Sequence, residues 1–414
     1  MLQLWFFANT LLWQINIELF GLKLGLNVLL LAIFGTVWIL RRQVIASYSA
    51  KMLFAFATIL VFTSLLGVIT GPCTDKFQKL LITAPVFLFL TLIGLEVGWR
   101  ATDRDWIKLQ KVAGWVLLGA FAGFSIEMLF PMAFPTTERY RNEAQFSGIY
   151  SEPSFVAFSL FPCLLILLDA QCKQVRRKGL FALFGLVLLS RSTTLIALIL
   201  VFILYHFIKK PNLGHAIYMI VGISLIAGMA AIFNYELLVA PTLDRIVGVA
   251  VVDSVDNLSS VVYLQGWQDA EENLLRTNGL GLGFNMMGCN PLPDVPARSV
   301  VGNLSDAQHN NEDGSILFGK LISETGVFGL IIFLALVWWW IKKELDLLRF
   351  SSDLQGPARS IPLVLILSFV ATSLIRSSGY FSGSFFILVV AVAATAKWQK
   401  DRIARIPARQ IIKK

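Results

Sequence analysis

The chain alternates apolar runs of helical length with short segments rich in Lys and Arg. A helix needs about 20 predominantly apolar residues to cross the hydrocarbon core of a bilayer. Twelve segments meet or approach this length, so the pattern predicts an all-α, polytopic integral membrane protein with about 12 transmembrane helices. The predicted segments are 2–17, 22–40, 52–70, 80–99, 112–130, 154–169, 178–190, 193–208, 216–238, 325–341, 361–375 and 385–398.

One interruption of this pattern is long. Residues 235–313, which precede the tenth predicted helix, contain no segment that could cross a membrane, although they carry apolar patches at 246–252 and 280–287. We therefore expect a single transmembrane domain over residues 1–414, in which residues 235–313 form a long loop that lies against the membrane.

The Lys and Arg residues indicate which ends of the segments face the cytoplasm. Short cytoplasmic loops of membrane proteins carry an excess of these residues. If both termini are cytoplasmic, 24 of the 35 Lys and Arg residues fall on that side. These 24 lie at 41–51, 100–111, 173–178, 209–210, 342–359 and after residue 396. The asymmetry predicts cytoplasmic N and C termini.

Arg191 interrupts an apolar run that is too long for one span. It is the only Lys, Arg, Asp or Glu within residues 179–208, and basic clusters flank this run at 176–178 and 209–210. Because both flanks carry the cytoplasmic signature, the run must cross the membrane an even number of times and reverse near Arg191. The reversal puts Arg191 at an exoplasmic hairpin tip and away from the bilayer centre, where an arginine costs roughly 2.5 to 3.5 kcal/mol or more.

Eleven Lys and Arg residues remain on the exoplasmic side, and seven of them are arginines. The guanidinium group is planar, permanently charged and suited to bidentate binding of phosphate. The seven are Arg139, Arg141, Arg191, Arg245, Arg276, Arg298 and Arg376. One interpretation is that they converge on a single anion-binding pocket, and the alternative is local pairing with carboxylates. The sequence does not decide between these interpretations for four of the arginines, Arg139, Arg141, Arg245 and Arg298. The nearby carboxylates are Glu138, Glu143, Asp244 and Glu272.

Composition narrows the classes of function. The chain is 56% hydrophobic and 15% charged, with a mean hydropathy of +0.71, which excludes a soluble globular protein. The net charge of +9 is explained by basic residues that anchor cytoplasmic loops to anionic lipid, so nucleic acid is not an expected partner. No signal-peptide cleavage pattern follows the first apolar run, which we expect to be retained as the first span.

The sequence also limits metal and sulfur chemistry. No Asp-x-Asp, His-Glu-x-x-His or paired-cysteine motif occurs on the exoplasmic side, so no metal or other cofactor is expected. Cys73 and Cys289 both fall on the oxidising side, where a disulfide between them can form.

Two glycine-containing strings stand near the exoplasmic arginines. The string RYRNEAQFSGIYSEPSF at 139–155 contains Glu152 and Pro153, which suit a helix start because proline fits the first turn and a carboxylate favours the positive helix end. The string LLRTNGLGLGFNMMG at 274–288 places alternating glycines after Arg276. Glycines let the backbone approach a phosphate or sugar closely, so this segment is a candidate binding loop.

His309 opens a third string, HNNEDGSILFGKLISETGVFGLIIF, which leads from a polar segment into an apolar helix. It is the only histidine that falls on the exoplasmic side. Histidine titrates near pH 6.5, so it can take a proton from a sugar hydroxyl or hold a phosphate oxygen. The alternative is that His309 has a structural role.

The order of these strings resembles the bacterial superfamily of O-antigen polymerases and O-antigen ligases, which are membrane glycosyltransferases. Its His-Asn pair followed by a Glu-x-Gly-x-x-Gly helix is matched by His309, Glu324, Gly326 and Gly329. The run LLSRSTTLIALIL is similar to its Ser-Arg hairpin, and TNGLGLGF is similar to its glycine-rich segment. The resemblance covers roughly residues 139–386, and the hexapeptide YSEPSF favours the polymerases.

The resemblance implies an enzyme of the bacterial inner membrane with its active site on the periplasmic face, partly on the long loop 235–313. Its donor is an oligosaccharide on undecaprenyl pyrophosphate, it needs no metal, and a chain-length regulator is a conceivable partner protein. Arg191 and Arg276 would neutralise the leaving pyrophosphate, and His309 would be the general base or a further phosphate contact. Further candidates for substrate binding are Arg139, Arg141, Glu152, Arg245 and Arg376.

Two other activities remain open from the sequence. A ligase would transfer finished glycan to the lipid A core. A flippase would only move the lipid-linked sugar, and transporters of that kind carry charged residues near the bilayer midplane and internal repeats.

The hairpin tip gives a direct test. We expect Arg191→Ala to abolish polymer while the protein stays in the membrane, and Arg191→Lys to restore little, because an ammonium lacks the guanidinium fork. The measurement is the length distribution of the surface glycan on a gel. Normal chain length in the Arg191→Ala strain would remove Arg191 from the active site.

Overall fold

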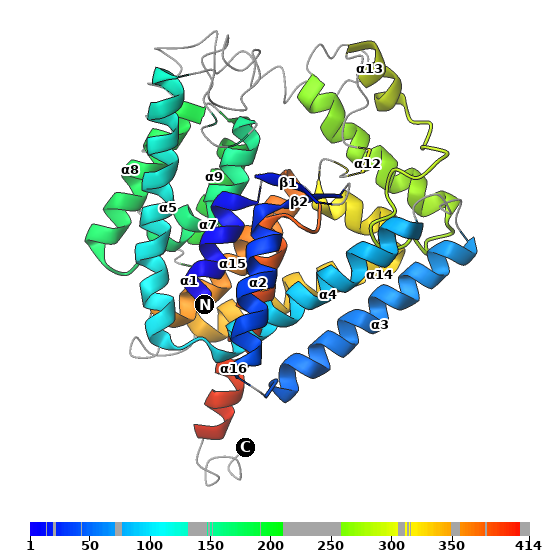
Figure 1. The fold of residues 1–414 in the computed structure, drawn as a ribbon. Coiled ribbons are helices and arrows are strands. Elements are labelled where there is room, and N and C mark those ends of the chain that lie inside the picture. Colours follow the sequence, from blue (N-terminus) through cyan, green and yellow to red (C-terminus); the bar gives the residue numbers. More distant parts are fainter. Residues whose placement is uncertain are drawn as a thin grey trace.

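The computed structural model describes residues 1–13, 15–19, 22–42, 44–70, 77–130, 147, 150, 152–190, 192–209, 258–304, 311–312, 314, 316–348, 357–376 and 379–405. Over these ranges the chain is predominantly helical, as predicted (Figure 1). The N-terminal half contains α1 (Leu2–Phe7), the π-helix η1 (Ala8–Leu12), β1 (Asn16–Leu19), β2 (Leu22–Gly25), α2 (Leu26–Leu40), α3 (Ser47–Thr70), α4 (Phe77–Arg100), α5 (Asp103–Leu129), α7 (Pro153–Leu168), α8 (Lys173–Ser190) and α9 (Thr193–Lys209). The C-terminal half contains α12 (Leu258–Arg276), α13 (Pro296–Leu304), α14 (Leu317–Leu348), α15 (Pro357–Ile375) and α16 (Gly383–Arg405).

A helix overlaps every predicted segment except 216–238, which lies outside the described residues. The boundary of the first segment is wrong. We expected it to extend to residue 17, but the helix ends at Leu12, and β1 and β2 then form a short antiparallel ladder. The sequence of this ladder alternates apolar residues with Glu18 and Lys23, which pair in register. Alternation with a period of two favours strand over helix.

Two helices form the interior of the bundle. In α7, 14 of 16 residues are buried, and α15 is buried over most of its length. A helix that is apolar on all sides is stable when other elements or lipid surround it. Accordingly α7 packs against α5, α8, α9 and α15, and α15 packs against α16 as well.

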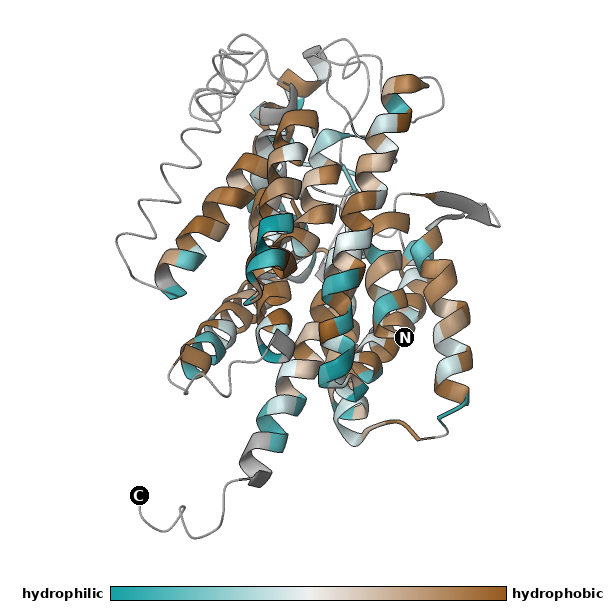
Figure 2. Ribbon diagram, turned by 90° about the vertical axis from the view of Figure 1, so that its left-hand side faces the viewer, coloured by the Kyte–Doolittle hydropathy of each residue, from teal (hydrophilic) through white to brown (hydrophobic). Residues whose placement is uncertain are grey.

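The outer helices present apolar side chains to their surroundings. Among the described residues, four helices are long and apolar enough to cross a membrane, at Ser47–Gly67, Gln78–Arg100, Asp103–Leu129 and Leu317–Leu348. Large side chains such as Phe54, Trp115 and Trp338 are about 70% exposed on them, and Figure 2 shows hydrophobic residues along much of the length of the helices. Exposing such side chains to water costs roughly 25 cal/mol per Å². A lipid environment removes this cost, which supports a membrane protein.

The predicted break at the Arg191 hairpin is present. Helix α8 ends at Ser190 and α9 begins at Thr193, and both pack against the interior helix α7. Ser190 is buried and its hydroxyl donates to the Leu186 carbonyl oxygen. Arg191 itself lies outside the described residues.

Hydrogen bonds and ion pairs group the described helix ends into two sets. One set joins Arg376 to Glu152, the Tyr150 hydroxyl to the Thr10 carbonyl, and the Ser147 amide to Glu127. The other joins Gln3 to the Asp105 carbonyl, Lys397 to the Ala101 carbonyl, and Arg100 to the Val44 carbonyl. Helices of alternating direction produce such a grouping of their ends.

The long loop 235–313 contains two helices that the hydrophobic pattern did not predict. Helix α12 packs along α14, and α13 packs on α12 through Val261, Val262, Ala297 and Val301. Figure 1 shows α12 and α13 on the side of the bundle away from the C-terminal end of α16. Helix α12 is too polar to cross a membrane because it carries one basic and three acidic residues.

A buried ionic cluster ties three helices together at the other end. The Lys209 ammonium, at the end of α9, lies 2.9 Å from Asp169 and 3.5 Å from Glu344 of α14. It also donates to the Tyr205 hydroxyl, which in turn donates to Glu344 at 2.9 Å. One ammonium is thus shared by two carboxylates whose side chains are each only 7% exposed.

This cluster predicts a large effect of Lys209→Met on stability. Removal of one partner from a buried ion pair costs about 3 to 5 kcal/mol because the other charge stays buried without compensation. We expect a markedly lower thermal unfolding midpoint in detergent, measured by tryptophan fluorescence. The matched control is Lys173→Met, at an exposed site on α8. Addition of Asp169→Asn and Glu344→Gln to Lys209→Met should recover much of the loss, and an unchanged midpoint in Lys209→Met would contradict the assignment.

Candidate functional site

Helix α14 breaks at Gly326. The break makes room for the glycine-rich segment, by which we mean residues 277–288. Gly326 has φ 63° and ψ −144°, and a Cβ atom there would lie 2.0 Å from the Gly279 carbonyl oxygen, so no other residue fits. The Val327 amide donates to Gly279, and the Leu282 and Gly283 amides donate to the carbonyls of Ser323 and Glu324. These three bonds, of 2.8 to 2.9 Å, replace helical bonds that the break removes.

We call this contact between the glycine-rich segment and the break in α14 the joint. The Glu324 side chain completes it. Its carboxylate is fully buried and accepts the Asn285 amide at 2.8 Å and the Met287 amide at 2.9 Å, one on each oxygen. Lys320, one helical turn earlier and also buried, places its ammonium 3.6 Å from this carboxylate. Charge-assisted bonds to a buried carboxylate are strong because no water competes for it. Glu324 therefore holds the glycine-rich segment in one conformation.

The glycine-rich segment also contacts two membrane-length helices. The Phe284 amide donates to Ser64 of α3, and the Asn285 side chain donates to Thr83 of α4. The Phe284 ring stacks on Tyr380 with a centroid distance of 4.9 Å. Burial, and then the nearby Glu324 carboxylate, raise the pKa of Tyr380 well above its usual value, so its phenol stays neutral.

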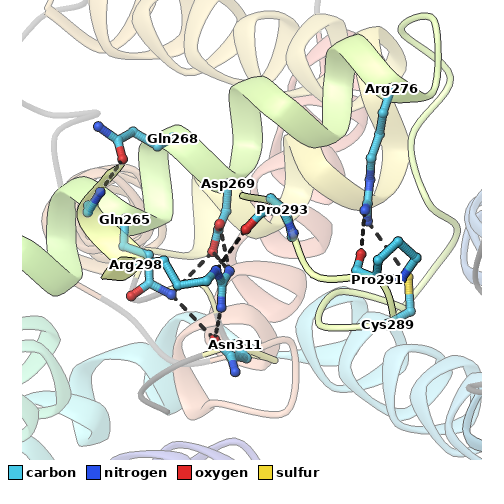
Figure 3. Close-up of polar contacts among 10 residues, drawn as sticks. Gln265, Gln268, Asp269, Arg276, Cys289, Pro291, Pro293, Arg298 and Asn311 are labelled. Atoms are coloured by element: carbon cyan, nitrogen blue, oxygen red, sulfur yellow. Dashed lines mark hydrogen bonds and ion pairs between the residues drawn. The ribbon is translucent and has the colours of Figure 1, made fainter. Parts of the chain in front are cut away.

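Arg276 ends α12 directly before this segment. Its guanidinium donates to the Pro291 carbonyl at 2.7 Å and to the Cys289 sulfur at 3.8 Å, while its buried Nε has no partner. Among the described residues no carboxylate lies within 4.0 Å of it. Figure 3 shows Arg276 apart from the other cluster on α12 and directed at the loop that holds Pro291. Arg276 is thus a half-buried arginine whose charge is not cancelled by an ion pair to any described carboxylate.

Arg298 is neutralised by a partner that we did not predict. Its Nη2 donates to both carboxylate oxygens of Asp269 of α12, at 2.7 and 2.8 Å, while Nε donates to the Pro293 carbonyl and Nη1 to Asn311 (Figure 3). Burial raises the pKa of Asp269 above its usual value, and the Arg298 guanidinium opposes that shift. Local pairing is therefore correct for Arg298, but the carboxylate is Asp269, not Glu272.

Arg376 and Glu152, both predicted to bind substrate, form an ion pair with each other. The Arg376 guanidinium lies 3.2 Å from the Glu152 carboxylate and 5.8 Å from the centre of the Phe155 ring. Glu152 is the N-cap residue of α7 and Pro153 follows at its first position, as the sequence predicted. The pair joins the start of α7 to the end of α15, and its charges largely cancel.

The predicted site residues do not all converge. Arg276 and Arg376 lie on elements that meet, because Tyr263 of α12 donates to the Leu374 carbonyl. However, Arg276 follows Tyr263 by 13 residues, so roughly 20 Å of helix separates it from that contact. Five other candidates lie outside the described residues, namely Arg139, Arg141, Arg191, Arg245 and His309.

The sequence also raised the questions of a disulfide between Cys73 and Cys289 and of a metal site. Cys289 is disulfide-bonded, and Cys163 and Cys172 are free. Cys73, the expected partner of Cys289, lies outside the described residues. In the part of the chain that the structure describes, no three His, Cys, Asp or Glu side chains are grouped so that they could hold a metal ion.

Sequence reasoning missed Lys320, Asp269 and Tyr380. Lys320 stands four residues before Glu324, a spacing that places both on one helix face and could have revealed the pair. Asp269 lies 29 residues from Arg298, and Tyr380 lies 56 residues from Glu324, so no local pattern relates them.

Comparisons with models of protein families, with curated proteins and with solved structures found no match.

The joint at Glu324 can be tested by hydrogen exchange. In Glu324→Gln one carboxylate oxygen becomes an amide that cannot accept a backbone N–H, so one charge-assisted bond, worth about 1.5 to 3 kcal/mol, is lost. We expect the amides of residues 282–289 to exchange about 10- to 100-fold faster, as measured by mass spectrometry. Glu271→Gln, at an exposed site on α12, is the control. Unchanged exchange in Glu324→Gln would show that the joint does not depend on the carboxylate.

Proposed function

We propose that this protein is a membrane glycosyltransferase that polymerises oligosaccharide repeat units carried on undecaprenyl pyrophosphate. In the reaction the bond between the anomeric carbon of the donor sugar and the pyrophosphate oxygen breaks. A bond forms between that carbon and a hydroxyl oxygen of the acceptor glycan, the hydroxyl proton passes to a base, and undecaprenyl pyrophosphate leaves.

One observation carries the proposal. The strings TNGLGLGF and SETGVFGL, which support the family resemblance by their order, are about 40 residues apart and form one joint through Gly326 and Glu324. Chance matches have no reason to contact one another. A joint between a glycine-rich loop and a broken helix, buried and closed by a Glu-Lys pair, is what two parts of one site would require.

In this proposal, Arg276 supplies the fixed positive charge that the reaction needs. A departing pyrophosphate accumulates negative charge, and a preorganised cation stabilises that charge without reorganising in the transition state. Arg276 retains its charge beside the glycine-rich segment, and its N–H groups are oriented by Pro291 and Cys289. Arg298 and Arg376 are engaged with carboxylates, so they shape the site and contribute less to binding an anion.

The remaining assignments follow the resemblance. Arg191 is the second pyrophosphate ligand and His309 is the base or a further phosphate contact. Arg139, Arg141 and Arg245 bind the sugars or the pyrophosphate. The enzyme has about 12 transmembrane helices in the bacterial inner membrane, cytoplasmic termini, and its active site on the periplasmic face, where a chain-length regulator would meet it.

The proposal is tested with purified protein in lipid nanodiscs and undecaprenyl-pyrophosphate-linked repeat units. A ladder of polymer lengths without an ion gradient is expected, and it would distinguish a polymerase from a transporter. We expect Arg276→Ala to lower the rate about 100-fold or more, and Arg276→Lys to recover little.

The control is Arg104→Ala, at an exposed site at the start of α5. Unchanged hydrogen exchange of residues 282–289 would show that Arg276→Ala acts on chemistry and not on the loop. A full ladder from Arg276→Ala would overturn the role of Arg276. Transfer of finished glycan to lipid A core, without elongation, would replace the polymerase by a ligase.

A further inference from the structure

Asn311, which precedes α14 in the chain, is held by α12 and α13. Its side-chain oxygen accepts hydrogen bonds from Arg298 of α13 and, at 3.4 Å, from Gln265 of α12. An amide oxygen has two lone pairs, so both of its acceptor positions are occupied. The orientation of the Asn311 side chain is therefore set by two other helices.

Arg298 is fully engaged at this place. Its three nitrogens donate to three different groups: Nη1 to Asn311, Nη2 to the Asp269 carboxylate and Nε to the Pro293 carbonyl oxygen (Figure 3). Asp269 is almost fully buried and also accepts from the Gln265 side chain at 3.5 Å. A planar guanidinium whose nitrogens are all engaged has one orientation. Arg298 is thus a rigid bridge between α12 and Asn311.

The position of Asn311 matters because of its neighbour in the sequence. His309, the predicted base or phosphate contact, precedes Asn311 by two residues and lies outside the described residues. Two residues of extended chain span at most about 7 Å. Arg276 follows Asp269 on α12 by two helical turns, or about 10 Å. One helix therefore carries Arg276 and, through the Arg298 bridge, anchors the chain two residues after His309.

We propose that Arg298 is a positioning residue, which acts through Asn311 to fix the placement of His309 relative to Arg276. The inference rests on the proposed function. A base must lie within about 2.6 to 3.2 Å of the atom whose proton it takes, and a displacement of about 1 Å can lower a rate about 100-fold. A phosphate contact is a hydrogen bond and has a similar distance requirement.

The alternative role for Arg298 is to bind the pyrophosphate directly, as proposed for Arg276. The contacts of the two arginines oppose it. Each nitrogen of Arg298 already has an acceptor, and one of these acceptors is the Asp269 carboxylate. Among the described residues, Arg276 forms no ion pair, and its Nε has no partner. The two arginines therefore differ in role, since one offers charge to a ligand and the other fixes a neighbouring segment.

The test is a double-mutant cycle on the polymerisation rate in lipid nanodiscs, with undecaprenyl-pyrophosphate-linked repeat units. Arg298→Ala and Asn311→Ala are each compared with the variant that carries both substitutions. We expect each single substitution to lower kcat about 10- to 100-fold, with KM within about threefold, because placement and not donor binding is lost. The double variant should be no slower than the slower single variant.

Effects that multiply in the double variant would show that Arg298 acts independently of Asn311, and they would overturn the proposal. An unchanged kcat in either single variant would do the same. In both cases the polymerase activity itself is intact, so the proposed function stands.

Two conservative variants separate placement from stability. Arg298→Lys keeps a cation beside Asp269, so the thermal unfolding midpoint should stay close to that of the unaltered protein. Its kcat should stay low, because the donors of an ammonium lie on one atom and cannot span acceptors that a guanidinium reaches with three nitrogens. Asn311→Asp keeps an acceptor oxygen, so its kcat should stay within about threefold of the unaltered value. A full recovery of kcat in Arg298→Lys, or a loss in Asn311→Asp as large as in Asn311→Ala, contradicts the proposal.

Hydrogen exchange reports the anchor without any turnover. In Arg298→Ala the amides of residues 305–312 should exchange about tenfold faster, whereas those of residues 282–289, which Glu324 holds, should not change. The matched control is Asp294→Ala, at an exposed site four residues before Arg298, which should change neither segment. Unchanged exchange of residues 305–312 in an active enzyme would reject the positioning role alone. Faster exchange in a protein that polymerises no donor would reject the proposed function, and with it the role of Arg298, although the anchor itself exists.

Discussion

The Glu324 carboxylate is the interaction on which the described part of the site depends. It accepts two amides of the glycine-rich segment, one on each oxygen, at a point where α14 has given up its own helical bonds. A buried carboxylate is costly unless it is compensated, and Lys320 and the two amides provide that compensation. The conformation of the glycine-rich segment therefore has one physical cause.

The distribution of charge separates binding groups from structural ones. Arg298 and Arg376 look alike in the sequence, yet each is neutralised by a carboxylate and joins two elements of the fold. Among the described residues, Arg276 donates to a carbonyl and a sulfur and forms no ion pair, so we propose that its charge is available to an anion. At the opposite end the Lys209 cluster serves the packing of α7, α9 and α14. Its one ammonium contacts both carboxylates of the cluster, as expected for a structural role.

The helices of the bundle were predictable and the long loop was not. Apolar runs mark α3, α4, α5 and α14 directly, because a membrane-crossing helix must satisfy its own backbone and expose apolar side chains. Helix α12 has no such constraint, and its weakly apolar sequence is stabilised by packing on α13 and α14. The start of α7 at Glu152 and Pro153 was predictable from the sequence because helix capping depends on neighbouring residues. The β1–β2 ladder was overlooked because its alternation is short.

The sequence by itself determined the class of protein, the approximate helices, the break beside Arg191 and the segments that carry polar chemistry. These are properties of neighbouring residues, so hydropathy, charge bias and spacing along the chain reveal them. Only the tertiary structure decided that Glu324 closes the glycine-rich loop, that Glu152 neutralises Arg376, and that Asp269 neutralises Arg298. These depend on contacts between residues from 29 to more than 200 positions apart, and the partner of a charged group in the fold is set by how the helices pack.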